Sequence, residues 1–231
     1  MFDILHQNSD FIIINKHPNV SVHKDDGETS LLLELAKESG DKQLYLVHRL
    51  DKMTSGILLI ARHQSAASEL SQAFAERLVQ KFYLAIGTKK PKKKQGTVIG
   101  DMQRSRRSSW KLLNSKENPA ITQFFSLPAG VSTGDGKAQR LFLCKPHTGK
   151  THQIRVALKS VGSAILGDPI YGDQSEADRG YLHAYQLTFE YQHETHTFRC
   201  LPEQGTEWLR DEVQLGLEQW QQPLSLPWPT L

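Results

Sequence analysis

Short runs of β-branched and aromatic residues recur along the chain, and they outnumber the stretches with helical spacing. These runs predict strands at residues 10–16, 43–50, 56–62, 81–88, 120–127, 139–146 and 181–191. Because the strands are not regularly interleaved with helices, the pattern favours an α+β fold over a doubly wound sheet.

Apolar residues at helical spacing predict three helices. The first contains Leu70, Phe74 and Leu78, with Ser65 as a plausible N-cap. The second runs from about residue 151 to 161 and stops at Gly162. The third lies within 205–231 and carries Leu209, Val213, Leu217 and Trp220 before a proline-rich tail. With no repeat and no Gly/Ser linker, we expect one domain over residues 1–231, with a basic insertion around 87–116.

Composition describes an ordinary globular protein, with 231 residues, of which 38% are hydrophobic and 23% charged. Two cysteines are too few for a disulfide framework and favour a reducing compartment. Asp3 and Asp10 stand where a secretory signal would carry basic residues, and no apolar run approaches the roughly 18 residues of a membrane helix. The expected location is the cytoplasm.

Positive charge is concentrated in residues 81–116, which hold 11 Lys and Arg and one acid, Asp101, for a net +10. The rest of the chain has 17 basic and 24 acidic residues, for a net −7. Such an excess is typical of proteins that bind nucleic acid, although lysines in a solvated loop would give a similar pattern. Arginines followed by Trp110 favour RNA or DNA, because guanidinium groups bind phosphates and an aromatic ring stacks on bases. The candidate phosphate-binding residues are Lys92, Lys93, Lys94, Arg104, Arg106 and Arg107.

No common nucleotide-binding or metalloprotease motif is present, and the ten histidines have no ligands at metal-site spacing. The segment HRLDKMTSG, residues 48–56, lies between two apolar runs. Asp51 therefore sits where a predicted buried strand enters a turn closed by Gly56. Its carboxylate is either a catalytic acid or a cap of that turn, and composition does not choose between them.

Two further segments carry candidate chemistry. In TGKTHQIRVAL, residues 148–158, a helix starting near Thr151 puts His152 and Arg155 on one face, as a cation source or as a solvent-facing stripe. In Lys81-Phe82-Tyr83, strand alternation puts Lys81 and Tyr83 on one face and Phe82 on the other.

Together these segments resemble the RluA-type pseudouridine synthases of RNA. The signature HRLDxxTSG is matched by His48, Arg49, Leu50, Asp51, Thr54, Ser55 and Gly56. Further motifs match in the family's order, namely Lys16, Pro18, Val22 and His23, the pair Lys81 and Tyr83, residues 148–156, GDPxYG at 167–172 and Leu-His-Ala at 182–184. The match spans roughly residues 11–200, and because the catalytic motifs start at once, we expect a member without the N-terminal RNA-binding domain that many relatives carry. Lys52-Met53 after HRLD and the missing proline after residue 191 depart from the family pattern and affect the choice of RNA, not the chemistry.

The resemblance implies a pseudouridine synthase fold with a mostly antiparallel mixed sheet, and isomerisation of uridine to pseudouridine without cofactor or metal. It assigns the catalytic positions to Asp51, Tyr83 and Arg155. Asp51 would be the nucleophile or electrostatic stabiliser, Arg155 its cation, and Tyr83 would lie against the uracil. One carboxylate suffices where a glycosidase needs two, because no water has to be activated.

The target uridine must leave its stack, and Arg49 is the residue expected to fill the gap. His48, Lys81, His152 and Leu182 are further expected RNA contacts, Leu182 being equally suited to the core. The 167–172 motif is expected to be a structural turn. A ribosomal or transfer RNA and a monomer without obligatory protein partners are expected. A non-catalytic RNA-binding or ribosome-assembly protein on the same fold is the alternative, and a hydrolase would lack its second carboxylate.

Overall fold

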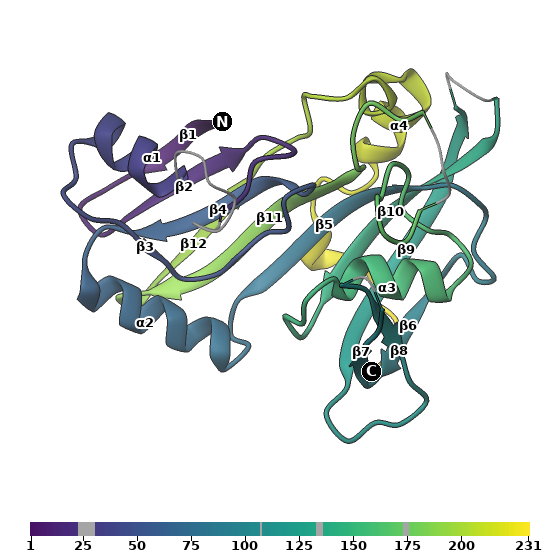
Figure 1. The fold of residues 1–231 in the computed structure, drawn as a ribbon, viewed down its shortest axis with the longest axis horizontal. Helices are drawn as coiled ribbons and strands as arrows, with labels where there is room; N and C mark the ends of the chain where they lie inside the picture. Colours follow the sequence, from purple (N-terminus) through teal and green to yellow (C-terminus); the bar gives the residue numbers. More distant parts are fainter. Residues whose placement is uncertain (23–30, 107, 133–135, 173–175) are drawn as a thin grey trace. The chain divides into compact units, whose positions relative to one another are not determined.

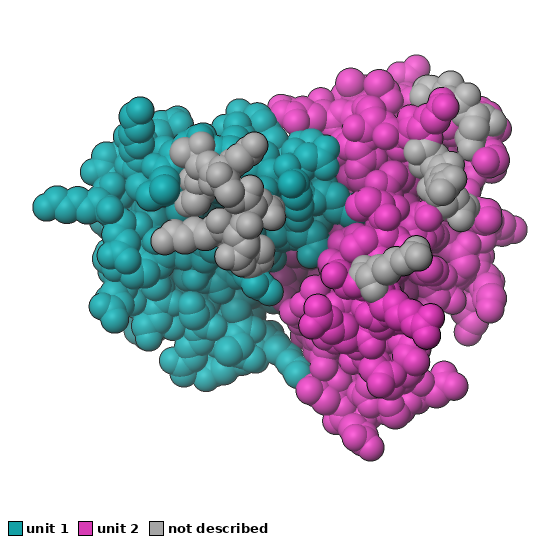
Figure 2. Space-filling model, in the orientation of Figure 1, with its two compact units in different colours: residues 1–80, 183–202 teal, residues 81–182, 203–231 magenta. Residues whose placement is uncertain are grey.

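The computed structural model describes residues 1–22, 31–106, 108–132, 136–172 and 176–231. They form two compact units, each made from two stretches of the chain (Figure 2). Unit 1 contains Met1–Gln80 and His183–Pro202, and unit 2 contains Lys81–Leu182 and Glu203–Leu231. The expected single domain stays a prediction, since both units draw on distant parts of the sequence.

The sheet of unit 1 is organised around β4 (Ser55–Ala61), as Figure 1 shows. One edge of β4 pairs antiparallel with β2 (Phe11–Lys16), which pairs with β1 (Phe2–Gln7). On the other edge, β11 (Leu182–Tyr191) runs parallel to the start of β4, and the short β3 (Tyr45–Leu46) pairs antiparallel with its end. Finally, β12 (Glu194–Arg199) pairs antiparallel with β11. The sheet is mixed and mostly antiparallel, which confirms the α+β prediction.

Two helices accompany this sheet, α1 (Leu31–Ser39) and α2 (Gln64–Ala75). Every residue of β2 and β4 is buried, which explains their nearly continuous apolar sequence. Ala66 and Leu70 of α2 pack in a core with Phe11, Leu59 and Phe189. That packing places α2 directly behind β4, the strand that follows the HRLD segment.

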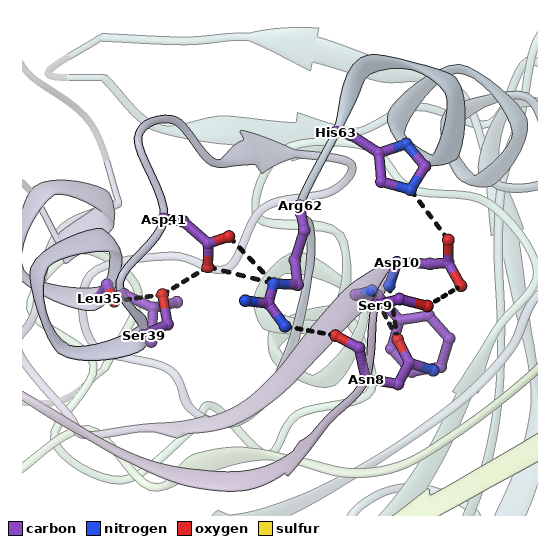
Figure 3. A network of polar contacts seen from close by, with 9 residues as sticks. Asn8, Ser9, Asp10, Leu35, Ser39, Asp41, Arg62 and His63 are labelled. Atoms are coloured by element: carbon purple, nitrogen blue, oxygen red, sulfur yellow. Dashed lines mark hydrogen bonds and ion pairs between the residues drawn. The ribbon is translucent and has the colours of Figure 1, made fainter.

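A polar network ties the β1–β2 turn to the end of β4 and to α1 (Figure 3). Arg62 Nε donates to both carboxylate oxygens of Asp41 at 3.1 Å, and Arg62 also donates to the Asn8 carbonyl at 2.5 Å. His63 binds Asp10 at 2.9 Å and accepts the Ala66 N–H, capping α2. The hydrogen bond from His63 lowers the pKa of Asp10. This network holds the end of β4 against the β1–β2 turn and α1, and it does not include the HRLD segment.

Unit 2 contains four strands that pair antiparallel in the order β5-β10-β9-β6. These strands are β5 (Gln80–Gly87), β10 (Ala138–Pro146), β9 (Ala120–Val131) and β6 (Gln95–Gly100). A small hairpin of β7 (Met102–Arg104) and β8 (Trp110–Leu112) follows β6. The basic region around 87–116 therefore lies partly in β6 and partly in a separate two-stranded hairpin.

Helices α3 (Gln153–Ser160) and α4 (Asp211–Glu218) and the 3-10 turns η2 (Thr206–Leu209) and η3 (Pro223–Ser225) complete unit 2. The proline-rich tail lies on the sheet, where the Trp228 ring packs 5.7 Å from Phe82 and 4.7 Å from Phe125. The Thr97 hydroxyl donates to the Thr230 carbonyl at 2.9 Å. Aromatic contacts and this hydrogen bond thus hold the tail against β5, β9 and β6.

Several predicted boundaries were wrong for local reasons. The strand over 43–50 shrinks to Tyr45–Leu46, and α1 was not predicted. His63, not Ser65, caps α2, and Leu78 lies beyond its end with 66% exposure. Leu209 is 60% exposed, because the last helix starts only at Asp211. Within the described part of the chain, no helix is long and apolar enough to span a membrane.

Candidate active site

Asp51 lies in a tight turn between β3 and β4. The Thr54 N–H donates to the Asp51 carbonyl at 3.0 Å, which closes the turn. Leu50 and Met53 on either side are buried, whereas Asp51 itself is half-buried and Lys52 is exposed. A carboxylate at the rim of a buried segment has a defined position and remains open to a substrate. The sequence predicted that Gly56 closes this turn. That prediction is wrong, because Gly56 lies within β4.

A buried lysine fastens the Asp51 turn from the side of β2. Lys16, at the end of that strand, has no solvent exposure. Its Nζ donates to the carbonyls of His17 (2.9 Å), Val20 (2.8 Å) and Lys52 (3.2 Å). The last of these carbonyls belongs to the residue directly after Asp51. Lys16 therefore links the segment that follows β2 to the backbone beside the candidate catalytic carboxylate.

Lys16→Met is expected to lower the free energy of unfolding by about 1–3 kcal/mol, because buried carbonyls lose their donor while the side-chain volume is kept. Turnover should fall as well, since the Asp51 turn loses its anchor. Chemical denaturation and tritium release from labelled RNA measure the two effects. Lys42→Met, at an exposed position of the same unit, is the control. Equal stability of the Lys16 variant and wild type would contradict the anchoring role.

The Ser and Gly of the HRLDxxTSG segment are explained by contacts with β11. Ser55 Oγ lies 2.8 Å from His183 Nδ1, and His183 Nε2 lies 2.9 Å from the Cys200 carbonyl. A carbonyl only accepts, so in neutral His183 the proton is on Nε2 and the Ser55 hydroxyl donates to Nδ1. Gly56 has a φ of +104°, and a Cβ there would lie 2.3 Å from the Ala184 carbonyl oxygen. The Leu-His-Ala motif thus supports the segment that carries Asp51.

His48 supports the same segment from within. Its Nε2 accepts the Leu59 N–H at 3.0 Å, and its ring stacks on Phe74 of α2 at 4.5 Å. Beyond the end of β3, the imidazole therefore provides the acceptor for a β4 backbone N–H that a strand carbonyl would otherwise provide. Arg49, next to it, is exposed. RNA contact by His48 and Arg49 stays a prediction.

In unit 2, Tyr83 and Lys81 lie on β5 with the predicted alternation. Phe82 is fully buried, and Lys81 and Tyr83 are half-buried. Tyr83 pairs across the sheet with Cys144 of β10. Burial lowers the pKa of His147, and the positive charges of Lys145 and Lys81 lower it further. Lys81 therefore adds to a cationic end of the sheet.

Arg155 is buried in α3 and forms a bidentate ion pair with Asp168. Nε and Nη2 donate to the two carboxylate oxygens at 2.7 and 2.8 Å, and the side chains are 4% and 0% exposed. The Ile170 and Tyr171 N–H groups also donate to Asp168, at 2.9 and 3.0 Å. Burial alone would raise the pKa of Asp168, but the Arg155 contacts and these N–H groups outweigh it and lower the pKa.

Asp168 is a residue that sequence reasoning missed. The GDPxYG segment was expected to be a structural turn only, whereas it supplies the carboxylate that holds Arg155. The solvent-facing alternative for Arg155 is wrong, because α3 buries every residue from Gln153 to Leu158. An aspartate beside proline in an apolar stretch was the available signal. It is typical of a carboxylate that accepts backbone N–H groups within its own turn.

The other predicted contacts are scattered over unit 2. His152 precedes α3 with a φ of +58°, so the helix starts later than expected. Leu182 is 3% exposed, and its carbonyl accepts from Arg179 at 3.3 Å, a placement that suits the core. Lys92, Lys93, Lys94, Arg104 and Arg106 are exposed. His23 and Arg107 lie outside the described residues. Among those described, no three His, Cys, Asp or Glu side chains gather where they could hold a metal ion.

Comparison with known proteins gives the family. A family profile described as RNA pseudouridylate synthase matches residues 10–160. The chain belongs to this family. A relative from Haemophilus influenzae, named as an uncharacterized RNA pseudouridine synthase, is 49% identical over 91% of this chain and 92% of its own length. Ribosomal large subunit pseudouridine synthase C of Vibrio parahaemolyticus is 32% identical over 81% of this chain and 61% of its own.

The solved structure of human RNA pseudouridylate synthase domain containing 1 resembles this chain with a TM-score of 0.75 and 28% identity. It covers 88% of this chain and 84% of the human one. The chain spans about three fifths of several other curated relatives that it matches. As a member of the family it is an RNA pseudouridine synthase, an isomerase that modifies RNA.

Proposed function

We propose that this synthase isomerises particular uridines in structured RNA, with Asp51 as the essential group. The bond between ribose C1′ and uracil N1 breaks, the uracil turns, and a bond from C1′ to carbon 5 forms. The proton on carbon 5 leaves to solvent and N1 gains one, so no water is consumed. Asp51 acts on C1′ as a nucleophile or stabilises its positive charge. Tyr83 lies against the uracil, and Arg155 keeps Asp51 ionised.

The fastening of the Asp51 turn is the observation that carries this proposal. Lys16 binds the Lys52 carbonyl, and the Ser55–His183 pair holds the start of β4. A catalytic carboxylate needs a defined position before substrate binds, because positioning supplies much of the rate. A turn capped merely for stability would not require support from two other strands.

Recognition requires the target uridine to leave its stack, which costs a few kcal/mol. We propose that exposed Arg49 enters the vacated space, where a planar guanidinium replaces the base. Four further residues contact the RNA around the flipped nucleotide, namely His48, Lys81, His152 and Leu182. The Leu182 contribution requires a movement, because that side chain is buried.

Affinity for RNA comes from the exposed basic residues of unit 2. The backbone of the lysine-rich segment is held in place, since the Lys92 N–H donates to the Val161 carbonyl at 3.1 Å. The Lys94 carbonyl accepts from the Ser126 N–H and hydroxyl at 2.7 and 2.8 Å. The side chains of Lys92, Lys93 and Lys94 are exposed on this fixed backbone. Asp101, the acid of the region, accepts the Glu117 and Asn118 N–H groups.

Replacing Lys92, Lys93 and Lys94 with Gln is expected to weaken RNA binding. The slope of log affinity against log salt should become shallower by about 0.7–0.9 for each phosphate that the variant no longer neutralises. The change should appear in KM rather than kcat, because phosphate contacts position the RNA and do not touch the uracil. Filter binding at several salt concentrations measures the slope. An unchanged slope would leave the lysines as a solubility feature.

We propose ribosomal or transfer RNA as the substrate, acted on in the cytoplasm by a monomer without cofactor or obligatory protein partner. The relatives named ribosomal large subunit pseudouridine synthase C and D support ribosomal RNA. Mapping pseudouridines in cells with and without the gene would identify the position. Sites in transfer RNA alone would exclude the ribosomal choice.

Release of tritium from total RNA labelled at carbon 5 of uracil tests the reaction. A synthase releases tritium to water and leaves the RNA chain length and base content unchanged. A non-catalytic RNA-binding protein releases none, which would overturn the proposal. A hydrolase would free uracil, and it would need a second carboxylate to activate water.

A further inference from the structure

The Tyr171 hydroxyl joins three segments of unit 2. Its oxygen accepts the Trp110 N–H at 2.7 Å, at the start of β8. It also shares a hydrogen bond of 2.9 Å with His152 Nδ1, directly before α3. Tyr171 itself belongs to the GDPxYG turn and is 5% exposed. One buried phenol thus connects the hairpin, the start of α3 and that turn.

The ring and backbone of Tyr171 contact the Arg155 ion pair. The guanidinium of Arg155 lies 5.1 Å from the centre of the ring, and Lys159 Nζ lies 5.6 Å from it. The Tyr171 N–H donates to Asp168 Oδ1, which also binds Arg155 Nη2. A displacement of Tyr171 would therefore change the position of Asp168 and of Arg155, the candidate catalytic arginine.

The hairpin held by Tyr171 presents basic side chains. Arg104, Arg106 and Lys111 are exposed, and Arg104 pairs across the hairpin with Trp110, whose N–H the phenol accepts. Inside the hairpin, the Ser105 N–H donates to the Ser109 carbonyl at 2.8 Å. At its base, the Leu113 N–H donates to the Asp101 carbonyl at 2.8 Å. These contacts shape the hairpin, whereas the Tyr171 hydroxyl connects it to the elements beside α3.

We propose that Tyr171 is a positioning residue that couples the basic hairpin to Arg155, so that RNA phosphates bound on the hairpin are held at a set place relative to α3. The inference rests on the proposed RNA-binding role of the hairpin. The hydroxyl provides the coupling, because it alone of the phenol's atoms hydrogen-bonds the hairpin backbone. The ring serves the Arg155 pair and is kept when the hydroxyl is removed.

Tyr171→Phe tests the coupling with the full chain and total RNA labelled with tritium at uracil carbon 5. We expect KM to rise about five- to tenfold, the loss typical of one hydrogen bond, while kcat stays within about twofold. Hydrogen exchange at residues 102–106 and 108–112 should accelerate, because the Trp110 N–H loses its acceptor. Tyr191→Phe, which removes a hydroxyl bonded to Gln192 in unit 1, is the matched control and should change none of these.

A second set of variants separates coupling from a structural effect. Replacing Arg104, Arg106 and Lys111 with Gln should weaken binding and flatten its salt dependence by about 0.7–0.9 for each phosphate that these side chains neutralise. Adding Tyr171→Phe to that variant should then change KM little, because the hairpin no longer holds RNA. Independent, multiplicative effects on KM would overturn the coupling.

The outcomes distinguish this inference from the proposed function. Wild-type KM and hydrogen exchange in Tyr171→Phe, with a flattened salt slope in the hairpin variant, would overturn the coupling alone. A wild-type salt slope in the hairpin variant would overturn both the coupling and the RNA-binding role of the hairpin. If the wild-type protein releases no tritium, the proposed synthase reaction itself is contradicted.

Discussion

Asp51→Asn is expected to abolish tritium release from labelled RNA while the protein stays folded and binds RNA. The amide keeps the shape of the side chain and loses its charge and nucleophilicity. The loss should reach at least about 10²–10³-fold, as for removal of a single electrostatic stabiliser in other enzymes. The turn itself should persist, because the Thr54 N–H binds the backbone carbonyl of Asp51 and not its side chain.

Single-turnover tritium release, thermal unfolding and RNA filter binding together check this result. Asp211→Asn, which neutralises an exposed carboxylate in the first turn of α4, is the matched control and should retain full turnover. Retention of more than a few per cent of wild-type turnover by the Asp51 variant would remove Asp51 from the mechanism.

Arg155→Met is expected to cost about 3–5 kcal/mol of unfolding free energy and nearly all turnover, because it leaves the Asp168 charge buried without its partner. Since the folded pKa of Asp168 is lowered, the stabilising contribution is present above its ordinary value of 3.8. It is lost as the pH falls through the folded pKa, so the cost is complete at neutral pH. Chemical denaturation at pH 7 measures it.

Combining Arg155→Met with Asp168→Asn separates structural from catalytic loss. The second substitution removes the buried charge and keeps an oxygen for the Ile170 and Tyr171 N–H groups. We expect the double variant to regain much of the stability but not the turnover, because the cation proposed to hold Asp51 ionised is still missing. The acidic limb of its residual pH–rate profile should move to higher pH. Recovery of turnover along with stability would make Arg155 a structural residue only.

Strands buried on both faces were predictable, because such burial requires a nearly continuous run of apolar residues. The observed β2, β4 and β10 lie within a residue or two of their predicted ranges. The segment 43–50 has similar apolar content but forms only a two-residue strand. There, the His48 side chain takes the Leu59 N–H that a continuing strand would have bound. Local propensity does not reveal such a substitution of side chain for backbone.

Site residues were predictable where the chemistry depends on a short segment. The HRLDxxTSG segment and the Lys-x-Tyr strand identified Asp51 and Tyr83 as candidates without any coordinates. The partners that hold these segments lie far away in the chain. Ser55 and His183 are 128 residues apart, Lys16 and Lys52 are 36 apart, and Trp110 and Tyr171 are 61 apart.

The family resemblance, the α+β class and the candidate carboxylate could all be predicted without the fold, because apolar periodicity and contiguous motifs are local properties of the chain. Three contacts appear only in the folded protein: Asp168 pairs with Arg155, Lys16 anchors the Asp51 turn, and Tyr171 joins the basic hairpin to α3. The physical reason is that a buried charge or donor must find a partner, and the fold brings that partner from whichever segment packs beside it.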